Sequence, residues 1–164
     1  MTQVVSFIGH HNSGKTTLLS QVITILIERG FRVGAVKHAP HLDDMDSRNT
    51  DSAQLREAGA EQTLLISEDT CALFWDTDPD EPIEELIERL FTGYDLVLVE
   101  GYKHGPFPKI EVYRSLETSA DPLAGEVEVI AVVTKEKVAL PDGVKVLSLR
   151  RPDEIADFIE AKFL

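Results

Sequence analysis

The residues with the clearest chemistry lie near the start of the chain, where Gly9 to Thr16 reads GHHNSGKT. This stretch matches G-x-x-x-x-G-K-[ST], the phosphate loop of proteins that bind nucleoside triphosphates. Lys15 is expected to reach the β- and γ-phosphates, and the Thr16 hydroxyl to ligate Mg²⁺. The pattern predicts a nucleotide site without choosing between ATP and GTP. The predicted loop residues are Gly9, His10, His11, Asn12, Ser13, Gly14, Lys15 and Thr16.

An acidic residue, Glu100, ends the apolar run DLVLVE. A buried parallel strand delivers its last side chain to the sheet edge where a phosphate loop also lies. Glu100 is therefore predicted to hold Mg²⁺, directly or through water. The alternative is an acid that only caps the following loop.

A guanine-reading pattern, N/T-K-x-D, is partly present from Thr134 to Lys137, which reads TKEK. Thr134 and Lys135 fit the pattern, but Lys137 stands where an aspartate accepts hydrogen bonds from guanine, and lysine cannot accept. Asp142 is a possible substitute. The residues alone leave the choice of base open.

Histidines and lysines follow three of the predicted strands, so a parallel sheet would gather them at one edge. This rim is predicted to bind a second anionic ligand, such as a phosphorylated cofactor precursor. Two alternatives stay open: some of the histidines ligate a metal, or they only hydrogen-bond loop backbone. The rim residues are His10, His11, Lys37, His38, His41, Lys103 and His104.

The polar segment 38–52 is a long loop, and such loops are usually functional. Its aspartates, among them Asp46 and Asp51, are candidates for contact with magnesium or water. Arg48 is the best candidate in the chain for an arginine that stabilises transition-state charge, with an arginine of a second subunit as the alternative. Asp51 is also a good N-cap for the helix that follows it.

The elements that must position these residues alternate along the chain. Continuous apolar runs are typical of strands buried on both faces of a parallel sheet, and between them lie helical stripes. The alternation predicts an α/β fold of the three-layer P-loop NTPase type, as one domain over 1–164, with a β-hairpin at 62–74. The expected strands are 4–8, 32–37, 95–100, 106–114, 127–134 and 145–149, and the expected helices 15–29, 51–58, 82–91 and 153–163.

The composition limits the class of protein. A net charge of −13 argues against a nucleic-acid binder and against docking on anionic membranes. The single cysteine, Cys71, allows no internal disulfide, and the start of the chain shows no signal peptide. We therefore expect a cytoplasmic protein with no membrane span.

The set GHHNSGKTTL, VKHAPH, DS…REAGA and LVEGYKHGPFPKIEV, in this order, resembles the MobB family of molybdopterin-guanine dinucleotide biosynthesis adaptors. The resemblance implies bound GTP, weak GTPase activity and a homodimer. It also implies molybdopterin as a possible second ligand and assistance to the guanylyltransferase that joins GMP to molybdopterin.

By position in the family's motifs, the resemblance implies roles for individual residues. Thr17 joins the phosphate loop, and Asp46 and Asp51 match aspartates of the loop before the second helix. The expected catalytic set is Lys15, Glu100, Asp46 and Arg48. The expected metal ligands are Thr16, Glu100 and Asp51.

Two other functions compete with this interpretation. A metal-insertion GTPase of the nickel-enzyme type would bind nickel or zinc through the histidines. A small-molecule kinase would need a lid whose arginines clamp the transferred phosphoryl group, and only Arg48 and Arg56 lie in a candidate mobile region.

Overall fold

The computed structural model describes residues 2–40, 45–47, 49–76, 78, 80–114 and 121–164. The chain forms two compact units, one made of Met1–His38 and Ile87–Leu164 and the other of Ala39–Leu86. The expectation of one domain over 1–164 stays a prediction. Within the described residues, no helix has the length and apolar character needed to cross a membrane.

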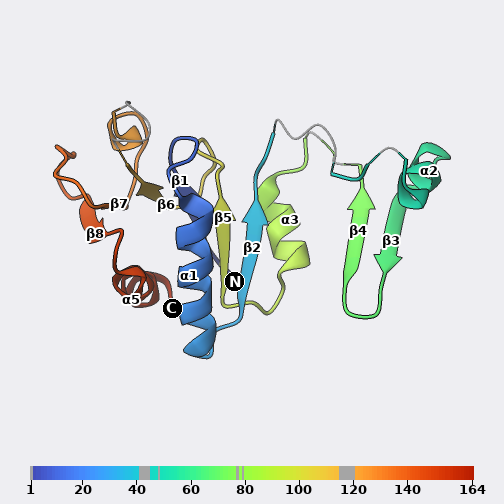
Figure 1. Cartoon of the computed structure of the whole chain (residues 1–164), viewed down its shortest axis with the longest axis horizontal. Coiled ribbons are helices and arrows are strands. Elements are labelled where there is room, and N and C mark those ends of the chain that lie inside the picture. Colours follow the sequence, from blue (N-terminus) through green and yellow to red (C-terminus); the bar gives the residue numbers. More distant parts are fainter. Residues whose placement is uncertain (1, 41–44, 48, 77, 79, 115–120) are drawn as a thin grey trace. The chain divides into compact units, whose positions relative to one another are not determined.

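The first unit is built on a six-stranded sheet with the order β2-β5-β1-β6-β7-β8, and every pair of neighbours is parallel (Figure 1). This confirms the predicted α/β class. The strands are β1 (Gln3–Ile8), β2 (Val33–Lys37), β5 (Leu96–Glu100), β6 (Lys109–Val112), β7 (Ala131–Thr134) and β8 (Lys145–Ser148).

The predicted strand 127–134 is shorter in the structure, because its first residues belong to the end of a turn. The N–H of Val127 donates to the carbonyl of Leu123, the first residue of the short 3-10 helix η1 (Leu123–Gly125). Pairing of β7 with its neighbours therefore starts only at Ala131.

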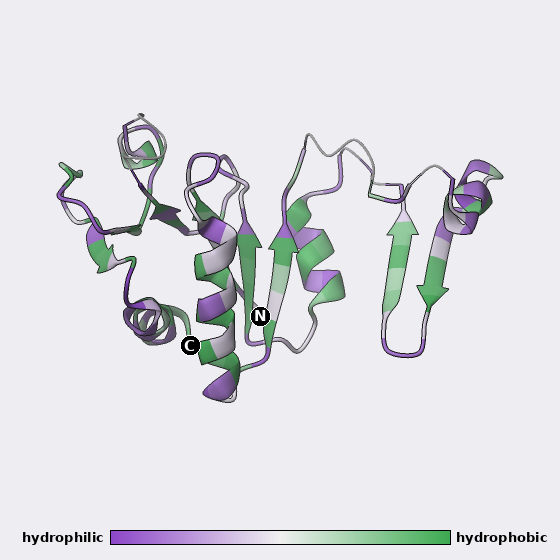
Figure 2. Cartoon of the chain, in the orientation of Figure 1, coloured by the Kyte–Doolittle hydropathy of each residue, from purple (hydrophilic) through white to green (hydrophobic). Residues whose placement is uncertain are grey.

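Helices α1 (Lys15–Glu28) and α5 (Pro152–Phe163) cover one face of the sheet. The apolar stripe predicted for α1 is buried there, together with Leu98 and Ile110 of the sheet. Figure 2 shows the consequence: β2 and β5 are mainly hydrophobic along their length, whereas α1 alternates between hydrophobic and hydrophilic residues. The stripe residues at the core are Leu18, Leu19, Val22 and Leu26.

The opposite face is covered by η1 and by the second half of α3 (Ile83–Leu90) with the residue that follows it. Leu123 packs with Ile8 and Val132. A Cβ on Gly34 would lie 2.4 Å from the Phe91 ring, so glycine at this position gives room to that ring. Helices on both faces were expected from the alternation of elements, and the structure confirms them.

The second unit holds helix α2 (Asp51–Glu57) and the antiparallel hairpin of β3 (Gln62–Ile66) and β4 (Cys71–Trp75). The hairpin confirms the prediction for 62–74. The prediction of Asp51 as N-cap was wrong. The cap is Thr50, whose hydroxyl accepts from the N–H of Ala53, because Thr50 has the extended backbone that a cap requires and Asp51 is already helical.

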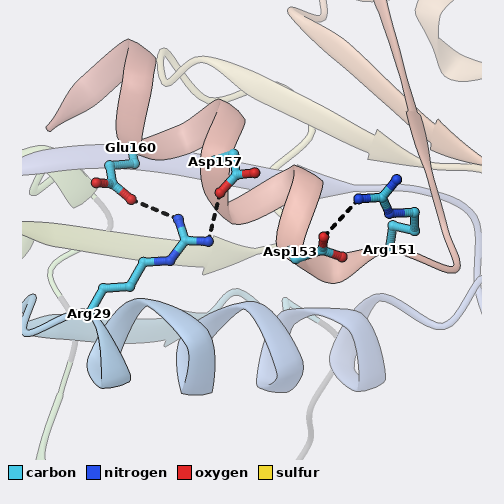
Figure 3. A network of polar contacts seen from close by, with 5 residues as sticks. All are labelled: Arg29, Arg151, Asp153, Asp157 and Glu160. Atoms are coloured by element: carbon cyan, nitrogen blue, oxygen red, sulfur yellow. Dashed lines mark hydrogen bonds and ion pairs between the residues drawn. The ribbon is translucent and has the colours of Figure 1, made fainter.

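One arginine joins the two helices of the first face (Figure 3). Arg29, the C-cap of α1, donates to Asp157 at 2.6 Å and to Glu160 at 2.7 Å, both on α5. Its side chain is 29% exposed, so the pairs are partly shielded from solvent. Arg151 makes a contrasting contact with Asp153, at the start of α5 itself.

We expect Arg29→Met to lower the free energy of unfolding by up to about 1 kcal/mol, because two ion pairs between helices are lost while the apolar stem is kept. Urea denaturation at low salt measures the change, which should shrink when salt is added. Arg151→Met is the matched control, because its pair links no second element. An equal change in the free energy of unfolding for Arg29→Met and Arg151→Met would contradict this interpretation.

Candidate nucleotide-binding site

The predicted phosphate loop joins the end of β1 to the start of α1, the strand-loop-helix context that the pattern requires. Asn12 and Gly14 both have left-handed backbone, with φ of 60° and 86°. Among the described residues, no side chain caps α1 and no acid lies in its first turn. The N–H groups at the start of α1 therefore form the kind of helix terminus that binds anions.

Strand β6 lies against this loop, and its backbone explains the first glycine of the pattern, whereas the second is required by its left-handed backbone. A Cβ on Gly9 would lie 2.4 Å from the carbonyl oxygen of Val112. A Cβ on Gly14 would lie 2.8 Å from Nη2 of Arg114. The sequence analysis did not single out Arg114, which enters the site only because β6 is the neighbour of β1.

Lys15 folds back over the loop. Its Nζ donates to the carbonyl of Gly9 at 3.0 Å and to that of His10 at 2.8 Å. Burial lowers the pKa of Lys15, the carboxylate of Glu100 opposes that effect, and the nearby Lys37 adds to it. The Lys15 ammonium therefore lies against the backbone of the loop and interacts electrostatically with Glu100, the predicted magnesium ligand.

Glu100 and Thr16 converge as predicted. The Thr16 hydroxyl donates to Oε2 of Glu100 at 2.8 Å, and Nζ of Lys37 lies 3.7 Å from Oε1. Parallel register produces the convergence, because Glu100 pairs with Phe7 of β1 on one side and with Lys37 of β2 on the other. A hydroxyl beside one carboxylate suits Mg²⁺, which prefers oxygen ligands and completes its shell with water and phosphate.

The rest of the rim is organised around an acid that the sequence analysis missed. Lys103 donates to Glu126 at 2.6 Å. That hydrogen bond, followed by the charges of His10 and His104, lowers the pKa of Glu126. Nε2 of His10 also donates to the carbonyl of Asp121 at 3.0 Å. His10, Lys103 and His104 therefore lie near one another, and the charge of Lys103 is already balanced by Glu126.

The other histidines differ in their surroundings. The His38 ring packs on the ring of Tyr102, with ring centroids 4.7 Å apart. The backbone N–H of His38 donates to the backbone carbonyl of Glu100. His11 is exposed, and His41 lies outside the described residues. In the part of the chain that the structure describes, no three His, Cys, Asp or Glu side chains are grouped as a metal centre.

A buried carboxylate anchors the segment that His10 touches. Glu111 of β6 is fully buried and accepts from the N–H groups of Leu123 at 2.7 Å and Ala124 at 2.9 Å. It therefore fixes the start of η1, directly after Asp121. The sequence analysis had Glu111 only as part of a motif in a strand, because nothing in the chain signals its distant partners.

The predicted base-reading loop leaves the sheet at the end of β7. Thr134 is buried, and its hydroxyl accepts from the N–H of Glu136 at 3.1 Å, which shapes the turn. Lys135, Lys137 and Asp142 are exposed. The loop thus starts at the same carboxyl edge of the sheet as the phosphate loop, and its part in base recognition stays a prediction.

Asp46 has partners within the second unit. The Thr50 hydroxyl donates to it at 2.7 Å and Arg56 at 3.2 Å. The pKa of Asp46 is lowered, mainly by the hydrogen bond from Thr50, then by Ser52, with a smaller contribution from Arg56. Asp46 therefore supports the start of α2. Its catalytic role and the metal role of Asp51 stay predictions, and Arg48 lies outside the described residues.

Comparison with known proteins gives a consistent result. The sequence model of the family "Molybdopterin guanine dinucleotide synthesis protein B", MobB, matches residues 4–135. The chain is 37% identical to a molybdopterin-guanine dinucleotide biosynthesis adapter protein of Haemophilus influenzae, over 93% of this chain and 84% of that one. It is 36% identical to the adapter protein of Escherichia coli, over 97% and 92% of the two chains.

Solved structures show the same relationship. A crystal structure of molybdopterin-guanine biosynthesis protein B superposes with a TM-score of 0.76 at 29% identity, over 96% of this chain and 98% of that one. A MobB homologue from Bacillus stearothermophilus superposes with a TM-score of 0.70 at 27% identity, over 98% and 97% of the two chains.

Proposed function

This chain belongs to the MobB family, and from that premise we propose that it is a GTP-binding adapter in the biosynthesis of molybdopterin guanine dinucleotide. The relatives that match nearly the whole chain carry the adapter name. The observation that carries the nucleotide part is the phosphate loop with Thr16 hydrogen-bonded to Glu100. The loop would bind the triphosphate, and the Thr16–Glu100 pair would bind its magnesium ion.

In the proposed complex, Lys15 and the N–H groups at the start of α1 bind the phosphates. Thr16 and Glu100 hold Mg²⁺, which would neutralise charge on the β- and γ-phosphates. Thr134 and Lys135 face the base. Guanine is favoured because the product named for the family contains it. Hydrolysis is slow in this proposal, so single-turnover cleavage faster than about 1 s⁻¹ would count against it.

The surface formed by His10, Lys103 and His104 is the proposed site for molybdopterin, the second ligand. Imidazole and ammonium groups suit a phosphorylated pterin. Glu126 holds Lys103 at 2.6 Å, so an incoming phosphate would exchange with that carboxylate. The surface is connected to the phosphate loop through His10, which belongs to both.

Reconstitution with the guanylyltransferase, molybdopterin and Mg-GTP tests the adapter role. Product formation is measured without the chain, with the chain and with its Lys15→Ala variant. The proposal expects a higher yield only with the unmodified chain. Equal yields in all three reactions would contradict it.

We also propose a homodimer that uses the hairpin. One face of the hairpin is partly covered, since Thr63 is buried and Arg56 of α2 lies over the Phe74 ring, 5.1 Å from its centroid, while Leu65 on the same face is 40% exposed. The other face carries Leu64, which pairs with Leu73, and Ile66 two residues on. These three side chains are 55%, 42% and 77% exposed. An open apolar face on a two-stranded hairpin gains stability when a second copy covers it.

We expect Leu64→Glu to convert the dimer to a monomer, because a charge would be buried where an apolar side chain meets the partner. Light scattering after size exclusion measures the mass. Ile27→Glu on α1, where Ile27 is 53% exposed, makes the same kind of change away from the hairpin and should leave the dimer intact. A monomeric unmodified chain, or a dimeric Leu64→Glu variant, would contradict this assignment.

A further inference from the structure

Arg114 follows β6 on the face of the sheet that α1 covers. Ile110 and Val112 belong to the core beneath α1 and α5, whereas Tyr113 belongs to the core of the opposite face. Tyr113 still donates its N–H to the carbonyl of Val133, so the extended backbone continues past the end of β6. Because side chains alternate along a strand, Arg114 falls on the α1 face, at the carboxyl edge of the sheet.

At that edge, the Arg114 guanidinium meets the phosphate loop. An added Cβ on Gly14 would lie 2.8 Å from Nη2 of Arg114 and 3.1 Å from Cζ. Gly14 is the N-cap of α1 and directly precedes Lys15. The guanidinium therefore lies beside the backbone whose N–H groups are expected to receive a phosphate chain.

We propose that Arg114 is a second phosphate-binding cation of this loop and contacts the phosphate chain of the nucleotide. The proposal rests on the nucleotide-binding function proposed above. A guanidinium is a planar fork that can bind two phosphate oxygens at once, whereas the Lys15 ammonium is a single point of charge. The anionic ligand would then meet the cations Lys15, Lys37 and Arg114, with Glu100 beside Lys37.

The sequence suggests Arg48, or an arginine of a second subunit, as the arginine that stabilises transition-state charge. Arg114 has a different role in this proposal, which is to bind the phosphate chain of the nucleotide. Arg114 comes from the same chain and from the strand beside the loop. Its contacts within the folded chain do not conflict with the role, because an arginine has five N–H donors. A purely mechanical alternative is that Arg114 only supports the backbone at Gly14.

Calorimetric titration of Arg114→Ala and Arg114→Lys with Mg-GTP, and in parallel with inorganic pyrophosphate, separates the two roles. The proposal expects Arg114→Ala to lose about tenfold to a hundredfold in affinity for both ligands, as for a lost hydrogen bond to a charged group. Arg114→Lys should keep an intermediate affinity, because it retains the charge but not the fork. Arg32→Ala removes the same charge at the opposite edge, where Arg32 donates to the Gly93 carbonyl, and should bind as the unmodified chain does.

Thermal melting of each variant is recorded beside the titrations. Equal pyrophosphate affinity for Arg114→Ala and the unmodified chain would overturn the inference. So would an Arg114→Lys variant as weak as Arg114→Ala with an equally lowered melting temperature, which indicates mechanical support alone. If the unmodified chain binds pyrophosphate but not GTP, the proposed function fails, while the pyrophosphate series still decides the role of Arg114.

Discussion

Lys15→Ala is expected to lower the affinity for Mg-GTP at least about a hundredfold, because Lys15 would make charge-assisted contacts to two phosphates. The half-buried ammonium is held at the loop by the carbonyls of Gly9 and His10. A triphosphate in the loop would offer it stronger, charged acceptors. Removal of Lys15 also leaves the negative charge of Glu100 with one fewer cation nearby, so Glu100 would repel the triphosphate more strongly.

The fold should tolerate the substitution, since the contacts of Lys15 are with its own loop. Fluorescence titration with a labelled GTP measures affinity, and circular dichroism melting checks the fold. Lys145→Ala removes a lysine at the start of β8, at the other edge of the sheet, and should bind GTP normally. Affinity of Lys15→Ala within a few-fold of the unmodified chain would contradict the assignment of the loop.

Glu111→Ala is expected to lower the free energy of unfolding by about 3 kcal/mol or more, because two N–H groups that it satisfies lose their acceptor. Leu123 and Ala124, which carry those groups, are themselves buried. The start of η1 would loosen, and with it the carbonyl of Asp121 that accepts from His10. The loss should therefore be accompanied by weaker ordering of the histidine side of the site.

Urea denaturation of the purified chain measures the change. Glu111→Gln keeps one acceptor oxygen and should lie between the unmodified chain and Glu111→Ala. Glu128→Ala, at an exposed position nearby, controls for the loss of a carboxylate and should change little. A Glu111→Ala variant as stable as the Glu128→Ala variant would show that the buried carboxylate is not an anchor.

The sequence predicts the central strands and the strand-loop-helix context of the phosphate-loop pattern, because both depend on local patterns. Runs such as VVSFI and DLVLVE carry several consecutive apolar residues instead of an alternation, which is typical of strands buried on both faces. The convergence of Glu100 with Thr16 also follows, since parallel strands that end together bring their last residues to one edge.

Contacts that depend on the order of the strands could not be predicted in the same way. Arg114 reaches Gly14 only because β6 pairs with β1, although all the elements from α1 to β5 come between them in the chain. Glu126 meets Lys103, 23 residues earlier in the chain, and Glu111 meets N–H groups 12 and 13 residues later, so no local pattern reveals either contact. The N-cap of α2 is a different case. Thr50 and Asp51 are both good capping residues, and the backbone conformation determines that Thr50 is the cap.

The proposal assigns base recognition to the loop after β7, where Lys137 stands in place of the aspartate that usually reads guanine. The buried Thr134 hydroxyl shapes this loop through the N–H of Glu136, so the backbone as well as side chains can face a base. Family membership, more than the side chains of this loop, is the main support for guanine in the proposed function.

Calorimetric titration of the unmodified chain with GTP and with ATP, each with Mg²⁺, tests the central proposal most directly. The account predicts that GTP binds at least about tenfold more tightly than ATP, a difference of about 1.4 kcal/mol. It also predicts that removing Mg²⁺ weakens GTP binding, because Thr16 and Glu100 then act without their ion. Equal affinity for the two nucleotides, or no binding of GTP, would contradict a GTP-binding adapter.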